Sequence, residues 1–328
     1  MPAILDRTKL SRGPAEIAYT TGGQTAYYLS VGDVTFDPGL ATKKLDSAAF
    51  GTVKTIRSGV KPTVSFDPLG MLRDLAITFP HAAMTPGHSL VGAYSGNPAV
   101  YADNTLVVRP LDQSQKKTTL YGAGISKVPD LNFTGQAQIF SGAMTFAIAG
   151  KNAVAADAAN RLLLREANDL DHPHYDPATL FAQVYDVTCA LFNNGNPLAT
   201  VGGIKVAFNL ATTDKGADGL LYDMSFKSID PTASFQPLGI SEDDLLAALA
   251  LQGAGSAIGK SVNDAGADLV ISAPGAYCKL PVAGISKASL IYGADAERVG
   301  VLDMVAGVQV DANGVPTPRF VLALAAPQ

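Results

Sequence analysis

PTVSFDPLG at residues 62–70 and PTASFQPLG at residues 231–239 agree at seven of nine positions. Each stretch reads as the end of a β-strand, followed by a proline that cannot donate to a strand ladder and by a glycine that favours a turn. The offset between the two stretches is 169 residues. A nine-residue segment that recurs about half a chain length later indicates a duplicated unit.

Two further pairs of segments occur in the same order around these stretches. Upstream, VGDVTF at 31–36 faces VGGIKVAF at 201–208, and downstream GISK occurs at 124–127 and again at 284–287. A period of roughly 165 residues is much longer than the 20–50 residues of a solenoid repeat. The order and spacing therefore predict a domain that is duplicated in tandem.

The length of 328 residues suits two domains of about 150 residues each. We expect domain 1 at residues 1–152, a helical and polar linker at 153–180, and domain 2 at 181–328. The linker contains the longest helical pattern of the chain, AVAADAANRLLLREA at 153–167, followed by the polar, proline-bearing stretch NDLDHPHYDP at 168–177.

The composition and the strand patterns predict a mainly β fold. Gly (32 residues) and Pro (20 residues) are abundant, which is typical of many turns, and 47% hydrophobic residues supply enough apolar material for two cores. We expect two β-sandwich or barrel-like domains, each with one flanking helix, at 69–77 and 241–251. The expected strands are 15–19, 26–31, 33–36, 63–66, 105–109, 118–121, 131–138 and 143–149, then 188–192, 204–210, 221–228, 232–235, 269–272, 276–282, 289–292 and 299–310.

Charge and targeting signals narrow the class of protein. The net charge of −5 argues against a general nucleic-acid binder, because no basic domain is present to neutralise phosphates. The N-terminal MPAILDRTKL has no apolar core of a signal peptide, and no run approaches ~18 apolar residues. Cys189 and Cys278 lie in apolar contexts and are expected to be buried thiols. We expect a protein without membrane insertion.

The residue types that carry chemistry do not form a recognisable site in the sequence. His172 and His174 lie in the linker without a third nitrogen or sulfur ligand, so we expect no metal there. Glu242, Asp243 and Asp244 follow Ser241 and are explained by the first turn of a helix. The glycine stretches YGAGIS and LQGAGSAIG lack the context of a nucleotide-binding turn. The expectation is no enzyme, no cofactor and no metal.

Three segments together resemble the tail tube proteins of bacteriophages. GPAEIAY at 13–19 is similar to their opening strand, FDPLGMLRDLAITFPHAAMTPGHSLVG at 66–92 to their turn and helix, and KTTLYGAGISKVPDLNFTGQAQIFSGAMTFAIAGKN at 117–152 to their closing strands. The resemblance covers residues 10–152 and extends to the second domain through the repeat. It departs at Lys287–Leu290, which lacks the Pro-Asp of Lys127–Leu131.

This resemblance implies a structural virion protein, the major tail tube subunit. In that family six β-sandwich or barrel-like domains form a ring whose inner strands join into one barrel, and rings stack into a tube that conducts DNA. A chain of two fused domains would form a homotrimer, a pseudo-hexameric ring. The implied partners are further copies, the tape measure protein in the lumen, and the tail terminator and distal tail proteins. The implied location is the virion tail, and the host cytoplasm during assembly.

The polar stretch at 40–61 is the candidate contact between stacked rings. Its charged residues for this role are Lys43, Lys44, Asp46, Lys54 and Arg57. A hairpin that only faces solvent is the alternative interpretation. The equivalent in the second domain, ATTDKGADG at 211–219, is expected to be a short turn, so the two domains are expected to stack unequally. The charged residues of that turn are Asp214, Lys215 and Asp218.

Two other functions remain open from the sequence. A related ring protein of the tail end, such as a distal tail or terminator component, would share the fold and cap the tube. A ligand-binding β-sandwich would be monomeric and would be expected to cluster aromatic residues. Aromatic residues make up only 7% of the chain and tryptophan is absent, so the sequence favours the structural role.

Overall fold

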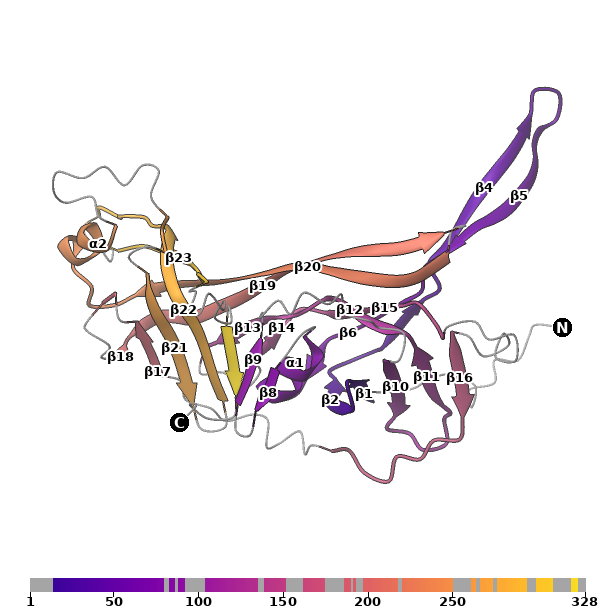
Figure 1. Cartoon of the computed structure of the whole chain (residues 1–328), viewed down its shortest axis with the longest axis horizontal. Coiled ribbons are helices and arrows are strands. Elements are labelled where there is room, and N and C mark those ends of the chain that lie inside the picture. The colour runs from indigo at the N-terminus through magenta and orange to yellow at the C-terminus, as the bar shows by residue number, and fades with distance from the viewer. Residues whose placement is uncertain are drawn as a thin grey trace, which may run out of the picture.

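The computed structural model describes a chain that is mainly β, with two short helices in its described part (Figure 1). This confirms the expected fold class at the level of secondary structure. The structure describes residues 14–79, 83–85, 88–91, 104–134, 139–151, 162–174, 186–189, 191–192, 197–217, 220–249, 261–263, 266–273, 276–293, 299–308 and 320–323. We call the residues up to 174 the first half and those from 186 the second half.

The first half is a sandwich of two sheets. Tyr19 of one sheet contacts Phe146 of the other, with ring centroids 4.9 Å apart, and the Tyr19 hydroxyl donates to the carbonyl of Ala123 across the sandwich. We call the six-stranded sheet of this sandwich the outer sheet and the four-stranded sheet the inner sheet. The outer sheet has the order β16 (Leu163–Glu166), β11 (Lys117–Tyr121), β10 (Thr105–Pro110), β1 (Ala15–Thr21), β2 (Gln24–Ser30), β7 (Pro68–Leu69). The inner sheet has the order β12 (Ala123–Lys127), β15 (Met144–Ile148), β6 (Thr63–Phe66), β3 (Thr35–Asp37).

The second half contributes most of a 14-stranded sheet whose two ends fold over a common core. The described strands do not close into a barrel, so the barrel-like alternative is not what one chain forms. Its path is β14 (Phe140–Ser141), β13 (Asp130–Phe133), β19 (Thr200–Ala217), β20 (Leu220–Pro237), β23 (Leu302–Val305), β22 (Ala276–Lys287), β21 (Ala267–Ala273), β17 (Asp186–Cys189), β18 (Pro197–Leu198), with β24 (Phe320–Ala323), β9 (His88–Val91), β8 (Ala83–Thr85), β4 (Leu40–Ser47) and β5 (Gly51–Val60) off this path.

Each half contains one short helix after the quoted nine-residue stretch. Helix α1 (Leu72–Thr78) starts later than expected, because Pro68 and Leu69 pair with β2. Helix α2 (Glu242–Ala248) has the expected N-cap: Ser241 accepts from the backbone N–H of Asp244, and the Asp244 side chain accepts from the backbone of Ser241. The Ser241 hydroxyl also donates to the Asp244 carboxylate, and this hydrogen bond, together with the one from the Ser241 backbone, holds the pKa of Asp244 below its usual value.

Strand pairing follows the same pattern in both halves. β1 pairs with β2 and β10 as β17 pairs with β18 and β21, and β6 pairs with β3 and β15 as β20 pairs with β19 and β23. The two GISK segments even carry the same irregularity, a register shift at Ile125/Lys127 and at Ile285/Lys287. Val282, the one non-glycine residue with positive φ in the described part, stands where the first half has Gly122.

Several expected elements differ in the structure. The helix expected at 153–167 is wrong for its last turn, because Leu163–Glu166 is strand β16 and pairs with β11; residues 152–161 lie outside the described part. The strand expected at 131–138 is described only to Phe133, and the strand expected at 299–310 is described as 302–305. The strand expected at 289–292 is reduced to one bridge between Leu290 and Val299.

The two halves are joined by strand pairing as well as by the chain. β13 of the first half pairs with β19, and β9 of the first half pairs with β24. Phe79, which follows α1, contacts Phe208 and Phe320 of the second half at centroid distances of 5.2 Å. One continuous hydrophobic core therefore spans both halves.

Candidate assembly surfaces

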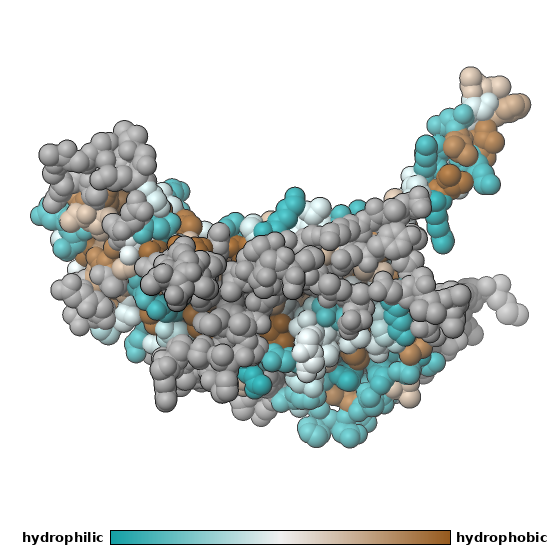
Figure 2. All heavy atoms as spheres, viewed as in Figure 1, coloured by the Kyte–Doolittle hydropathy of each residue, from teal (hydrophilic) through white to brown (hydrophobic). Residues whose placement is uncertain are grey.

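A hairpin of β4 and β5 projects from the body of the molecule (Figure 1). Alternating Thr, Val and Ile residues in β5 favour an extended strand, yet most side chains of both strands are exposed. Figure 2 shows hydrophobic and hydrophilic residues intermixed along this projection. All five residues predicted for a contact between rings lie on it and are exposed: Lys43, Lys44, Asp46, Lys54 and Arg57.

The second half contains a hairpin of the same register. In the first hairpin, Ala41 lies opposite Gly59, and Thr42 lies opposite Arg57, which leaves Ser58 as an extra residue. In the second, Ala211 lies opposite Ser228 and Thr212 opposite Phe226, which leaves Lys227. A second bulge recurs in the same way, with Val53 and Tyr222 as the extra residues. The paired segments of the two hairpins therefore have the same length and the same two bulges.

The expected short turn at 211–219 is therefore wrong. Residues 211–217 continue β19, and Asp214 and Lys215 are strand residues opposite Met224 and Asp223. Asp218 lies outside the described residues. The polar sequence ATTDKGA suggested a turn, but pairing with β20 holds it extended.

The base of each hairpin decides its direction. In the first half, Pro38 and Gly39 separate β3 from β4, and Gly39 has φ +56. A Cβ at Gly39 would lie 1.9 Å from the carbonyl oxygen of Lys61, so only glycine fits. In the second half, Phe208 and Asn209 occupy the corresponding positions within the unbroken strand β19. The first hairpin therefore turns away where the second continues straight (Figure 1).

The second hairpin lies across the first half and is held there by apolar contacts. Leu221 and Met224 are buried and form a cluster with Ala147 and Ala149, at the end of β15. A spacing of three residues would place two side chains on opposite faces of a regular strand. The bulge at Tyr222 brings Leu221 and Met224 onto one face, which explains their joint burial.

One ion pair links the base of the first hairpin to the second. Lys61 Nζ lies 3.1 Å from Asp214 Oδ2, and both side chains are about half exposed, at 56% and 46%. Asp214 is thus a partner of the first half of its own chain. An exposed pair of this kind contributes ~0–1 kcal/mol, so the apolar cluster of Leu221 and Met224 dominates the docking.

Sequence reasoning did not identify Leu221 and Met224 as contact residues. Their only signal in the sequence is a pair of large apolar residues in a polar hairpin, at a spacing that does not match a strand. The bulge that aligns them is visible only once the register is known.

The junction of β13 and β19 is the second surface between the halves. Leu131 lies opposite Val206, and Phe133 lies opposite Ile204, and all four side chains are buried. At its edge, Lys205 Nζ lies 2.8 Å from Asp130 Oδ2. This junction is an edge-to-edge addition that combines main-chain pairing with a continuous core.

A charged cluster fixes the segment that leaves the first half. Glu16 is buried in β1, and its Oε2 accepts a hydrogen bond from the backbone N–H of His174, at 2.8 Å. The His174 ring stacks on Tyr27 at 3.5 Å. Lys117 and Arg109 hydrogen-bond to Asp169 and hold the pKa of its carboxyl below the usual value, mainly through Lys117. The contacts of His174, Glu16 and Asp169 therefore hold this segment against the first half.

The other residues considered for metal binding or catalysis are the two cysteines and the acidic residues at the start of α2. Within the described residues, His, Cys, Asp and Glu side chains do not gather in groups of three or more that could hold a metal ion. Cys189 and Cys278 are buried free thiols, as expected; burial raises the pKa of Cys189 and raises that of Cys278 to about 12. Glu242, Asp243 and Asp244 occupy the first turn of α2.

Comparison with known proteins identifies no relative of the chain: no family model matches it, and no curated protein is similar to it in sequence. Neither helix of the described part is long and apolar enough to cross a membrane.

Proposed function

We propose that this chain is the major tail tube subunit of a bacteriophage, built from two tail-tube-type domains that arose by duplication. Three chains form a pseudo-hexameric ring, and rings stack into a tube through which DNA passes. The tape measure protein occupies the lumen during assembly, and the terminator and distal tail proteins bind the ends of the tube.

The observation that carries this proposal is the recurrence of one pairing pattern. Corresponding strands pair in the same order in both halves, and the hairpins share register and both bulges. Bulges are specific features of a fold, so their recurrence at matched positions favours a common origin of the two halves. A protein with two equivalent units in one chain is suited to a ring that alternates them.

The strand count supports a ring of useful width. In the proposed ring, four strands of each half would face the channel: β12, β15, β6 and β3 in the first half, and their counterparts β22, β23, β20 and β19 in the second. Three chains would contribute about 24 strands, and at ~4.7 Å spacing their circumference is roughly 113 Å. The diameter is about 36 Å for untilted strands and about 47 Å at a tilt of ~40°. Closure would also remove the open sheet edges.

The charge of the chain fits passage of DNA without binding. The net charge is −5. An acidic lumen repels phosphates over roughly a Debye length, about 8–10 Å at physiological ionic strength. DNA would then move through the tube without adhering to its wall.

In this proposal the two hairpins divide the work. The second hairpin stays within its own chain and ties the two halves together through Leu221 and Met224. The first hairpin, turned away at Gly39, reaches the next ring with Lys43, Lys44, Asp46, Lys54 and Arg57. Unequal stacking of the two halves thus remains our prediction, although the paired segments of the two hairpins are equal in length.

Negative-stain electron microscopy of the purified protein over a range of concentrations tests the proposal. We expect tubes with a regular axial repeat and a central channel. Single rings that never stack would favour a ring protein of the tail end, such as a distal tail or terminator component. A monodisperse monomer at every concentration would contradict both.

Deletion of residues 43–57 tests the role of the first hairpin. The deletion removes the exposed part of β4 and β5 and leaves the base at Leu40–Thr42 and Ser58–Val60. We expect rings that no longer stack. The substitution Thr55→Ala at an exposed position of the same hairpin is the control and should leave the tubes intact; tubes of normal length after the deletion would contradict the assignment.

A further inference from the structure

The junction between β13 and β19 has unoccupied counterparts at both ends of the chain. On the β19 side, Lys205 pairs with Ser234 as Thr35 pairs with Ser65, so Phe36 corresponds to Val206. On the β13 side, the bridge of Leu290 with Val299 corresponds to the pair of Asp130 with Ser141, so Ile291 corresponds to Leu131. These equivalences follow from the pairing registers alone.

The corresponding residues differ in their exposure to solvent. Val206 and Leu131 are fully buried in the junction inside the chain, whereas Phe36 and Ile291 are each 42% exposed. Within the described part of the sheet, β3 is an end strand. Each end of the chain therefore presents one half of a junction that the middle of the chain completes.

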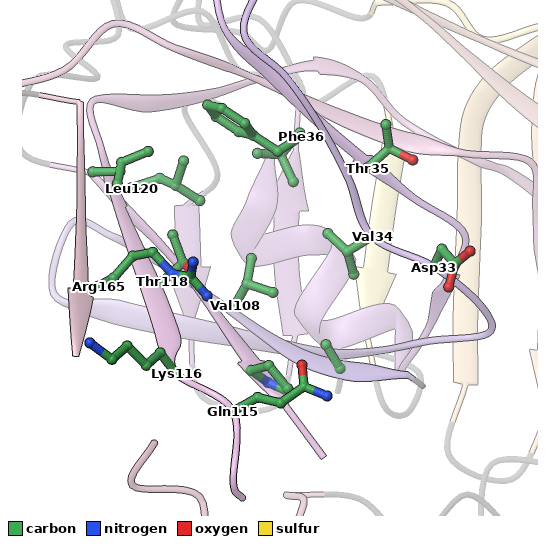
Figure 3. A pocket seen from close by; sticks show the side chains of 14 residues that line it. Asp33, Val34, Thr35, Phe36, Val108, Gln115, Lys116, Thr118, Leu120 and Arg165 are labelled. Atoms are coloured by element: carbon green, nitrogen blue, oxygen red, sulfur yellow. The ribbon is translucent and has the colours of Figure 1, made fainter. Parts of the chain in front are cut away.

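A cavity of about 660 Å³ opens beside β3, between the two sheets of the first half (Figure 3). Its wall includes Phe36 of β3, Val34 just before β3, and Val108, Leu120 and Leu163 of the outer sheet, and Lys116 and Arg165 also line it. The corresponding positions of the second half, among them Ile204, Val206, Leu280 and Phe320, are buried in the core that contains Leu131 and Phe133 of β13.

The two exposed ends do not meet within one chain. The hydroxyl of Tyr292 donates to Glu242 Oε1 at 2.6 Å, which places this segment beside α2. β3 pairs with β6 in the other half, and Figure 1 shows α2 and β6 in different parts of the molecule. Residues 290–292 therefore do not reach β3 of their own chain.

We propose that residues 290–292 of a second copy of this chain add to the edge of β3 and close the cavity beside it. This inference deepens the proposed function and rests on it. The expected register is antiparallel, with Ile291 opposite Phe36 and Tyr292 opposite Thr35, as Leu131 lies opposite Val206 and Asn132 opposite Lys205 inside the chain. The interface is heterologous, because each copy contributes a different surface at each end.

The chemistry of this interface differs from that of the junction inside the chain. The ion pair of Lys205 with Asp130 has Thr35 and Leu290 at the corresponding positions. Apolar contact between Leu290, Ile291 and Phe36 takes its place. Association through this interface is therefore expected to persist at high salt, since the hydrophobic term is not screened.

A pair of single-cysteine variants, Phe36→Cys and Ile291→Cys, tests the register. Opposed residues of antiparallel strands have Cβ atoms about 4.5–5.5 Å apart, close enough for a disulfide after small adjustments. Cys189 and Cys278 are buried and do not compete. We expect a disulfide-linked dimer, seen on a non-reducing gel, only when the two variants are mixed and oxidised.

The matched control is Val201→Cys mixed with Ile291→Cys, since Val201 is similarly exposed at 47% but lies outside β3. Crosslinking of Phe36→Cys no stronger than this control would overturn the inference. Tubes that form without this crosslink would leave the proposed function standing, whereas the crosslink without tubes or rings would support the interface and contradict the function. If neither the crosslink nor tubes or rings form, both the interface and the proposed function are overturned.

Phe36→Asp provides a second readout that does not depend on disulfide geometry. We expect a folded monomer with an unchanged circular dichroism spectrum and no rings, because Phe36 is partly exposed and its substitution leaves the core intact. Normal rings from this variant would overturn the inference.

Discussion

The two hairpins of this chain have the same backbone and different positions. Both carry bulges at matched points, and their paired segments beyond the base match in length, yet β19 and β20 lie across the first half while β4 and β5 project into solvent. The difference rests on two local features. Pro38 and Gly39 break the first hairpin at its base, and Leu221 and Met224 replace Thr52 and Thr55 on the docking face of the second.

This comparison separates what sets the register of a hairpin from what sets its location. Backbone pairing and bulges persist although few residues of the two hairpins are identical beyond Leu-Ala-Thr at 40–42 and 210–212. Location depends on a few side chains and one glycine. Two hairpins of the same register can therefore take different positions without a change in the strand pairing of their sheets.

The double substitution Leu221→Asp with Met224→Asp is expected to have the largest effect. It places two charges on the face that packs against Ala147 and Ala149, and burying an unpaired charge is costly, so we expect the hairpin to leave the first half. Loss of both buried side chains would cost about 3–6 kcal/mol of unfolding free energy. Chemical denaturation and hydrogen exchange of β20 measure this. The control is Thr52→Asp with Thr55→Asp at the corresponding exposed positions; equal costs for both double variants would contradict the docking.

Leu221→Ala should have the next largest effect, because it truncates one of the two docked side chains. Large-to-small substitutions at buried sites cost about 2–5 kcal/mol, and we expect the lower end for this small cluster. Thr52→Ala, at the corresponding exposed position, should change stability by less than ~0.5 kcal/mol. If urea denaturation finds the two variants equally stable, Leu221 does not hold the hairpin.

Gly39→Ala tests the turn at the base of the first hairpin. The substitution places a Cβ against the carbonyl of Lys61 at a positive φ, and we expect a loss of ~1–3 kcal/mol. Asn209→Gly, at the corresponding position of β19, should cost only ~0.5–1 kcal/mol through added chain entropy. Thermal denaturation compares the two, and a harmless Gly39→Ala would contradict the role of this turn.

The ion pair of Lys61 with Asp214 should have the smallest effect. A double-mutant cycle of Lys61→Ala and Asp214→Ala is expected to give a coupling of ~0.2–1 kcal/mol, reduced further by added salt, because both side chains are about half exposed. A coupling above ~2 kcal/mol would show that the ion pair, rather than Leu221 and Met224, positions the second hairpin.

Sequence reasoning located the features that local chemistry determines. The strand at Thr63–Phe66, the start of α2 at Ser241 and the burial of both cysteines follow from propensity, capping and apolar context. It failed where pairing overrides local preference. Leu163–Glu166 reads as helix but pairs with β11, and residues 211–217 read as a turn but are held extended by β20.

The assembly surfaces were predicted only in part. The exposed charges of the first hairpin were visible as a polar stretch, whereas the docking of Leu221 and Met224 depends on a bulge. The pairing of β13 with β19 joins residues about 70 positions apart in the chain, and no periodicity in either segment signals it.

We propose that one chain supplies two equivalent units of a ring. Cryo-electron microscopy of the assemblies, viewed along their axis, would show this arrangement. We predict rings of three chains in which six similar densities surround a channel, with the first hairpin of each chain directed toward the next ring. Closed dimers, or rings in which the two halves of a chain occupy unrelated environments, would contradict the claim.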